Sequence, residues 1–187
     1  MIMPMAFAAL TFLVVLVATG LYNWLIELAR RCDQAAADID VQLQQRAALI
    51  PNLVAVVKGY AAHEHGTLEA VARARNAALA APAGAGQVQA ELALGSALGR
   101  LLAVAEQYPD LKASAVFLQL QGELGDIENK IAAARRFLNN VVAEYNTTRA
   151  QFPASILSLI CRFAPRDFGV APPQSRGTID TAPSVGF

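Results

Sequence analysis

Few side chains in this sequence have the types and spacing that catalysis requires. His63, Glu64 and His65 are consecutive and could approach a metal ion, but no second group of ligands follows at a recognisable spacing. Asp38 and Asp40 are two positions apart, so on a helix their side chains project about 200° from each other and cannot act as an acid–base pair. We therefore expect no catalytic residue, no metal site and no cofactor.

The remaining reactive residue types also have simple structural explanations. Cys32 and Cys161 are too few for a disulfide framework, so we expect two free thiols, which favours a reducing compartment. Cys32 could be acylated or redox-active, but a small buried helix residue is the simpler interpretation. Gly84 and Gly86 lack the preceding strand and the further glycine of a phosphate-binding loop, so they indicate a linker.

Charge and composition exclude some partners and favour a membrane. Fifteen basic residues balance fifteen acidic ones, so there is no overall field that would attract nucleic acid. The chain is 55% hydrophobic and only 16% charged, and no charged side chain precedes Glu27. The apolar excess is therefore concentrated at the N-terminal end.

Residues 4–26 have the length and composition of a transmembrane helix. A helix of this length spans roughly 34 Å, which matches a hydrocarbon core of roughly 30 Å. A cleaved signal peptide is the competing interpretation, but no basic residue precedes the apolar run and no small-residue cleavage site follows it. We predict a transmembrane anchor over residues 1–26.

Aromatic and basic residues at the end of the anchor predict its orientation. Tyr22 and Trp24 stand where an aromatic belt would mark the membrane interface, and Arg30 and Arg31 follow. The positive-inside rule then places the short N-terminus outside and the rest of the chain in the cytoplasm. The prediction is a single-pass membrane protein.

Beyond the anchor the sequence predicts an all-α fold. Helix-forming residues dominate, and turn signals delimit four helical segments: from the anchor to residue 62, then 67–81, 87–107 and 111–149. We expect residues 27–150 to form an antiparallel four-helix bundle whose first helix continues the anchor. Pro51 should kink this first helix without ending it.

Two heptad seams run through the long first and fourth segments at alternating three- and four-residue steps. The first seam comprises Tyr22, Leu25, Ala29, Cys32, Ala36, Ile39, Leu43, Arg46, Ile50, Leu53, Val57 and Tyr60. The second comprises Phe117, Leu120, Leu124, Ile127, Ile131, Ala134, Leu138, Val141 and Tyr145.

The middle helices are too short to cover the first and fourth, so the membrane-proximal halves of the long pair should project as a two-helix stalk. Apolar stalk positions without a cover would seek a second copy of the chain or a protein partner. The alternative is that the linker at residues 81–86 or the C-terminal tail covers the stalk. The candidate assembly surface comprises Ala29, Cys32, Ala36, Leu138, Val141 and Tyr145.

Arg46 is the only charged residue on the first seam, and burial would require a carboxylate partner on the facing helix. Glu128 is the main candidate, with Asp126 and Glu123 as alternatives. Such a pair would fix the register of the two helices. The competing interpretation is that the Arg46 side chain extends to solvent along its aliphatic stem.

Residues 151–168 predict a short amphipathic segment followed by an extended or disordered tail over residues 169–187. Its apolar residues fall near one side of a helix, so it could lie on the membrane surface or, alternatively, pack on the stalk. The apolar set comprises Phe152, Ile156, Leu159, Ile160 and Phe163.

Four sequence blocks follow one another in a recognisable order: ADIDVQLQQRAALIPNLVAVVKGYAAHE at residues 37–64, TLEAVARAR at 67–75, LLAVAEQYPDLKAS at 101–114 and LQGELGDIENKIAAARRFLNNVVAEYNT at 120–147. These blocks resemble the LemA family of bacterial membrane proteins. The resemblance implies a bacterial inner-membrane protein with one N-terminal span, a helical bundle and no assigned enzymatic activity. Ile127 and Leu138 replace the Thr and Tyr that are usual in the family, which argues against a hydroxyl-dependent role at these positions.

We therefore expect a membrane-anchored helical scaffold or adaptor that self-associates or presents its bundle to an unidentified protein partner, without catalysis. The alternatives are a regulatory accessory subunit of a membrane enzyme and a ligand-binding bundle. A ligand-binding bundle would need convergent polar groups in its core, which the seams almost lack.

Overall fold

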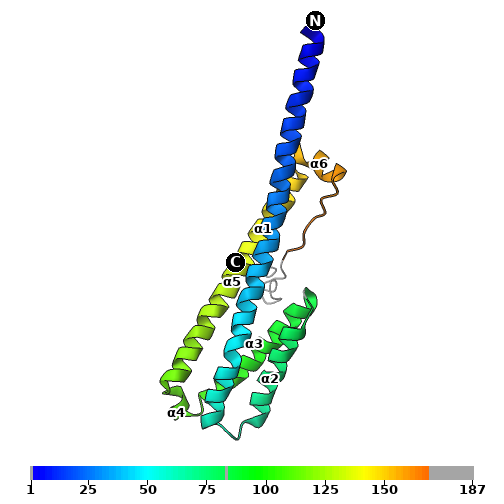
Figure 1. Ribbon diagram of the computed structural model, residues 1–187. Coiled ribbons are helices and arrows are strands. Elements are labelled where there is room, and N and C mark those ends of the chain that lie inside the picture. Colours follow the sequence, from blue (N-terminus) through cyan, green and yellow to red (C-terminus); the bar gives the residue numbers. More distant parts are fainter. Residues whose placement is uncertain (1, 83, 169–187) are drawn as a thin grey trace, which may run out of the picture. The chain divides into compact units, whose positions relative to one another are not determined.

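The structure, a computed structural model, describes residues 2–82 and 84–168, and every regular element in these residues is a helix (Figure 1). The predicted all-α fold is therefore confirmed, whereas the predicted extended tail at 169–187 lies outside the described residues. The helices are α1 (Ile2–Tyr60), α2 (His65–Ala80), α3 (Ala85–Ala105), α4 (Pro109–Lys112), α5 (Ala115–Ala150) and α6 (Ala154–Ile160).

The four predicted segments correspond to α1, α2, α3 and α5. Pro51 lies inside α1, which continues through it as expected. The start of the fourth segment differs, because Pro109 begins the separate four-residue helix α4. A turn in which the Ser114 N–H donates to the Leu111 carbonyl at 3.0 Å separates α4 from α5.

The chain divides into two compact units that cut across the long helices. Of the described residues, unit 1 combines 2–39 with 133–168, and unit 2 comprises 40–82 and 84–132. Each unit therefore contains one part of α1 and one part of α5. This division does not coincide with the boundaries predicted at residues 26 and 150, which remain predictions.

Unit 2 has one hydrophobic core to which α1, α2, α3, α4 and α5 all contribute. Ile50, Val71, Leu101 and Leu111 are among its nearly inaccessible side chains. Burying such side chains supplies the main favourable term for folding. Helices α2 and α3 also pack directly against each other. The antiparallel four-helix arrangement within this unit remains a prediction.

The second predicted seam matches the observed burial along α5. All nine of its positions are buried or partly buried. The first seam matches less completely, because Tyr22, Ala36 and Tyr60 are exposed and Ala35 is buried in place of Ala36. An α-helix has 3.6 residues per turn, so a strict 3.5-residue repeat drifts around its surface and shifts the buried position by one residue.

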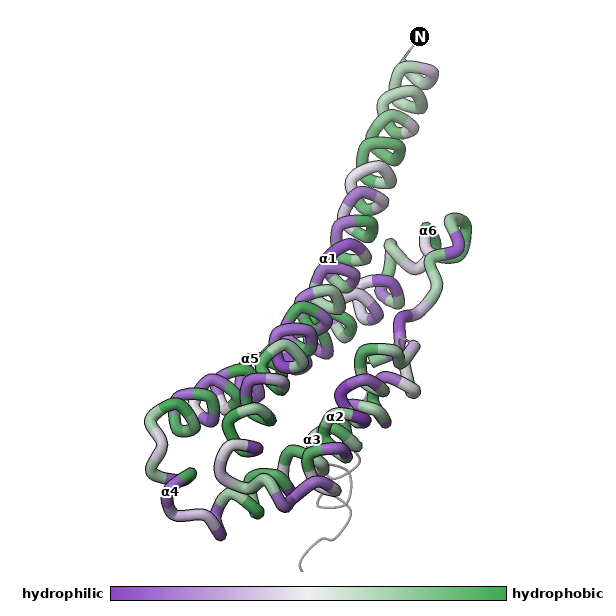
Figure 2. The backbone as a smooth tube through the Cα atoms, turned by 60° about the horizontal axis from the view of Figure 1, so that its bottom comes forward, coloured by the Kyte–Doolittle hydropathy of each residue, from purple (hydrophilic) through white to green (hydrophobic). Residues whose placement is uncertain are grey.

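In unit 1, the N-terminal turns of α1 carry apolar side chains that nothing in the unit covers. Met3, Phe7 and Phe12 are among the most exposed, and the tube in Figure 2 is mostly green along these turns. By length and composition, α1 is one of two described helices that could cross a membrane. The other is α3, which places Leu94, Leu98 and Leu101 in the core of unit 2.

Candidate functional sites

The most deeply buried charges lie in unit 2, where Arg46 of α1 meets two carboxylates. Its guanidinium forms an ion pair with Glu91 of α3, and the two side chains are 5% and 7% exposed. Arg46 Nη1 also donates to Glu128 Oε1 of α5 at 2.6 Å, and the Glu128 side chain is 46% exposed. One cation thus links three helices, and removing it would leave the Glu91 carboxylate buried without a counterion.

Glu128 was the main predicted partner of Arg46, and the structure shows this contact. The two alternative carboxylate partners make other contacts. Glu123 accepts a hydrogen bond from Gln119 at 2.8 Å, and Asp126 lines a surface groove with Lys130. A role of the Arg46–Glu128 pair in setting helix register remains a prediction. The solvent-exposed alternative for Arg46 does not match its burial.

Glu91 was not among the predicted site residues, although its local sequence carries a signal. It is the only charged residue between residues 85 and 99. Because a residue three positions before the buried Leu94 lies near the same helix face, its carboxylate must either reach solvent at the edge of that face or be buried beside a basic partner. Its partner is Arg46, which comes from a helix that the local pattern cannot identify.

A groove in unit 2 reaches the Glu91 carboxylate. It has a volume of about 250 Å³ and is lined by the polar residues Asp40, Gln44, Gln87 and Glu91 together with apolar neighbours. Gln87 Nε2 donates to Asp40 Oδ1 at 2.9 Å, so two of these groups already satisfy each other. The groove is smaller than the roughly 300 to 1,000 Å³ of typical ligand pockets.

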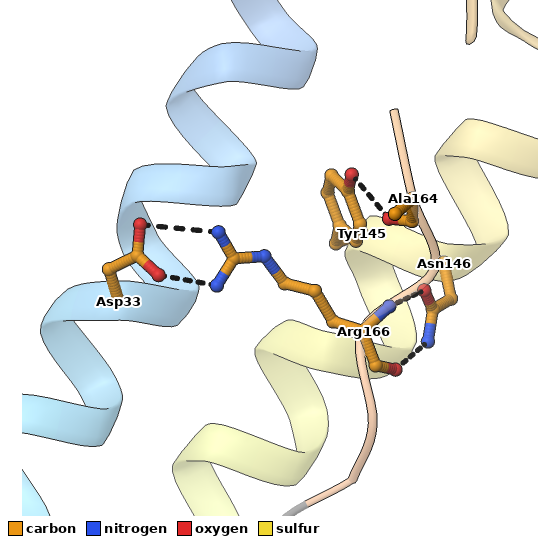
Figure 3. Close-up of polar contacts among 5 residues, drawn as sticks. All are labelled: Asp33, Tyr145, Asn146, Ala164 and Arg166. Carbon is orange, nitrogen blue, oxygen red and sulfur yellow. Dashed lines mark hydrogen bonds and ion pairs between the residues drawn. The ribbon is translucent and has the colours of Figure 1, made fainter. Parts of the chain in front are cut away.

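A second polar site in unit 1 holds residues 163–166, here called the C-terminal clasp, against α5 (Figure 3). Tyr145 donates its hydroxyl to the Ala164 carbonyl at 2.9 Å. Asn146 binds the Arg166 backbone at both polar groups, accepting from its N–H at 3.0 Å and donating to its carbonyl at 2.8 Å. Peptide groups of the clasp are therefore paired with side chains of α5.

The Arg166 side chain connects the clasp to α1. Its guanidinium forms a two-pronged ion pair with Asp33, in which Nη2 lies 3.2 Å from Oδ2, and it also lies 5.7 Å from the centre of the Tyr145 ring (Figure 3). The hydrogen bond to Asp33 raises the pKa of Arg166 above its usual range. The adjacent Cys32 thiol is a free thiol whose pKa is raised by burial, although the Arg166 charge opposes this shift.

The candidate assembly surface on the stalk requires a correction. Cys32, Val141 and Tyr145 are buried within unit 1, and Ala29 and Leu138 are partly buried against the same cluster, so only Ala36 is exposed. The physical reason is that α1 and α5 cover each other's apolar positions here and the clasp binds Tyr145. The clasp, which belongs to the segment predicted at residues 151–168, contacts the stalk at Tyr145 and Asn146.

Helix α6, which precedes the clasp, exposes most of the predicted amphipathic face. Ile156, Leu159 and Ile160 are exposed, as is Phe152 just before the helix. On the opposite side, Ala154 and Ser158 are buried, and Ser158 Oγ donates to the Arg149 carbonyl at 3.2 Å. Phe163 differs from the others because it follows α6 and its ring lies 5.8 Å from that of Tyr22.

The predicted orientation residues all lie in unit 1 on α1. Tyr22 and Trp24 are about half exposed, as side chains at a membrane interface would be. Arg30 is exposed, and Arg31 pairs with Glu27 one turn earlier at 2.5 Å. A surface pair of this kind contributes little to stability. The roles of these four residues in the membrane remain predictions.

The residues first considered for chemistry do not gather into a site. His63 and Glu64 lie between α1 and α2, and His65 is the first residue of α2. Within residues 2–82 and 84–168, no group of three or more His, Cys, Asp and Glu side chains is arranged to hold a metal ion. Cys161 is exposed just after α6.

Comparison with known proteins gives one family match and several relatives. The model of the LemA family matches residues 35–187, beginning beyond the apolar stretch. The chain is 27% identical over 168 residues to the magnetosome protein MamQ of Magnetospirillum gryphiswaldense. It is 26% identical over 168 residues to magnetosome proteins MamQ 1 and MamQ 2 of Paramagnetospirillum magneticum. Each match covers 76% of this chain but only 62% of the relative.

Proposed function

We propose a role as a membrane-anchored helical scaffold or adaptor for this chain, which belongs to the LemA family. In this proposal the apolar part of α1 spans the bacterial inner membrane once, with the N-terminus outside. The helical domain at residues 27–150 then meets a second copy of the chain or a protein partner in the cytoplasm. The chain performs no catalysis.

The exposed apolar surface of α1 is the observation that carries this proposal. Between Met3 and Val17, large apolar side chains on all sides of the helix are exposed, including Phe7, Leu10 and Phe12. A soluble domain rarely exposes a contiguous apolar surface of this size, and a helix that is apolar all round is typical of a membrane span. The same helix continues without interruption into the core of unit 2.

The internal pairing of the polar groups supports a structural role. The charges of the Arg46 cluster are engaged by one another, and side chains of α5 satisfy backbone groups of the clasp. Catalytic groups are instead expected to converge on a cavity with room for a substrate. Magnetosome proteins are among the relatives, so a role in a specialised membrane is one form that the scaffold could take.

Chemical crosslinking in native membranes followed by mass measurement tests this proposal. The expected product is heavier than one chain, and its mass distinguishes a homo-oligomer from a complex with another protein. A matched sample solubilised in denaturing detergent before crosslinking controls for random collision. A product with the mass of a single chain across all crosslinker concentrations would contradict the scaffold proposal.

Binding of a small ligand in the groove next to Glu91 is the second candidate function, since this groove brings polar side chains to a buried carboxylate. A role as the regulatory subunit of a membrane enzyme is the third candidate function. In the crosslinking experiment a regulatory subunit predicts a companion other than a second copy, whereas a ligand-binding bundle predicts a product with the mass of a single chain.

A further inference from the structure

Helix α6 has the side-chain distribution of a helix that lies in a membrane interface. Leu159 and Ile160 are 84% and 72% exposed, whereas Ala154 and Ser158 on the other side are almost inaccessible. The helix carries no charged residue, and the exposed Arg162 stands two positions after its last residue. Apolar side chains beside a basic residue suit the boundary between acyl chains and anionic headgroups.

The position of α6 along α1 matches this chemistry. Phe163 packs on Tyr22, with ring centres 5.8 Å apart, and Tyr22 lies five positions before Glu27, the first charged residue of α1. Both rings belong to unit 1, and α6 lies beside α1 in Figure 1. If residues 4–26 span the bilayer, Tyr22 marks the cytoplasmic interface, and α6 is held at the same depth.

The clasp keeps α6 at that depth without covering its apolar face. Four hydrogen bonds connect residues 163–166 to Tyr145, Asn146 and Arg149 of α5, and the ion pair with Asp33 connects them to α1. These contacts fix the chain immediately after α6. The buried side of α6 contacts α5, where Ser158 Oγ donates to the Arg149 carbonyl at 3.2 Å, so packing on the stalk and contact with the membrane are compatible.

We infer that α6 inserts its apolar face into the interface of the same bilayer that α1 spans, held there by the pairing of Arg166 with Asp33 and Asn146. This inference rests on the proposed membrane anchoring. It gives the chain two attachments to one membrane, so that the end of α5 as well as α1 is fixed at the lipid surface.

Depth-dependent fluorescence quenching tests the inference on the full chain in vesicles of phosphatidylcholine and phosphatidylglycerol. A Cys32→Ala, Cys161→Ser background carries one new cysteine, labelled with a small environment-sensitive fluorophore, and the acyl chains carry bromine as quencher. The three sites are Leu159→Cys on α6, Phe12→Cys in the proposed span and Leu92→Cys on α3, all at exposed positions. We expect quenching at residues 159 and 12 and none at residue 92.

The outcomes separate the two proposals. Quenching at residue 12 but not at residue 159 would overturn the insertion of α6 while leaving the anchor intact. An absence of quenching at residue 12 would overturn the anchor and, with it, this inference. Fluorophores at residue 159 that quench one another between chains but are insensitive to brominated lipid would show that α6 contacts a second copy instead.

A matched pair of variants tests the clasp. Asp33→Asn removes the carboxylate that pairs with Arg166, whereas Asp38→Asn makes the same change at an exposed position on the same helix. We expect Asp33→Asn to lower the ratio of inserted to detached α6 by up to about fivefold, the size expected of a partly exposed ion pair. Asp38→Asn should leave the ratio unchanged. Equal quenching at residue 159 in both variants would overturn the role of the clasp.

Discussion

Arg46 and Glu91, 45 positions apart in the sequence, form an ion pair in which both side chains are more than nine-tenths buried. Glu128 provides a second carboxylate that also reaches solvent. Charges removed from water in this way need their partners, because an unpaired buried charge costs far more than a lost surface contact.

Replacing Arg46 should strongly destabilise the protein. We expect Arg46→Leu to lower the free energy of unfolding by about 3 to 5 kcal/mol, because Glu91 remains buried without its counterion. Arg100→Leu, at an exposed arginine on α3, is the matched control and should stay within about 0.5 kcal/mol. Chemical denaturation of the full chain in detergent measures both. A melting temperature and oligomeric state unchanged in Arg46→Leu would show that the buried pair is unimportant.

Removing both charges should cost less than removing Arg46 alone. In the Arg46→Leu, Glu91→Leu double variant no carboxylate is left unpaired at the centre of the cluster, and replacing a buried ion pair with apolar residues is often nearly neutral. A double-mutant cycle with the two single variants gives the coupling energy. The interpretation fails if the two substitutions simply add.

The seam along α5 predicts which of its leucines stabilise the fold. Leu124 is buried in the core of unit 2, whereas Leu118 on the same helix is about half exposed. We expect Leu124→Ala to cost about 2 to 5 kcal/mol and Leu118→Ala to stay within about 0.5 kcal/mol. Similar losses from the two variants in denaturant titrations would contradict the observed burial.

The two cysteines should differ sharply in their reactivity. Cys32 is buried and the pKa of its thiol is raised, so at pH 8 less of it is thiolate than at an ordinary cysteine, and reagents reach it slowly. In the Cys161→Ser variant we expect alkylation by iodoacetamide to be about tenfold or more slower in the folded protein than in denaturing detergent. Equal rates in the two states would show that Cys32 is accessible.

The same shift gives a direction for the pH dependence of stability. A thiol whose pKa is raised on folding retains its proton in the folded state at a pH where the unfolded chain has lost it. The contribution of the Cys32 thiol to the free energy of unfolding is therefore fully present below the ordinary thiol pKa of 9.0. It decreases as the pH rises above that value. Replacing Cys32 with Ala should flatten the decline in stability measured above pH 9.0, and an identical decline would refute the assignment.

Local pattern was sufficient to predict the helices and much of the core. The period of apolar residues defines α5 from Phe117 to Tyr145, and turn residues separate α1, α2 and α3. Residue types also identified Arg46 as a charge that would need a partner. The choice of partner depends on packing between distant segments, and this is why Glu91 was missed and Glu128 was only one of three candidates.

Sequence patterns could not predict the clasp for the same reason, because its contacts join distant segments of the chain. Arg166 and Asp33 are 133 positions apart, and neither stands out in its local sequence. Without this contact, the sequence pattern leaves Cys32 and Tyr145 as uncovered apolar positions and predicts an assembly surface there. In the structure α1 and α5 pack against each other at these positions, so most of the predicted surface is part of a buried cluster.

Labelling of single cysteines in cells tests the membrane-anchored scaffold most directly, because the whole proposal depends on one span with the helical domain inside. In a Cys32→Ala, Cys161→Ser background, Met3→Cys and Leu92→Cys place thiols at exposed positions before the span and on α3. We predict that a membrane-impermeant maleimide labels residue 3 in intact cells and residue 92 only after permeabilisation. Labelling of residue 92 in intact cells, or loss of residue 3 from the mature protein by cleavage, would contradict the account.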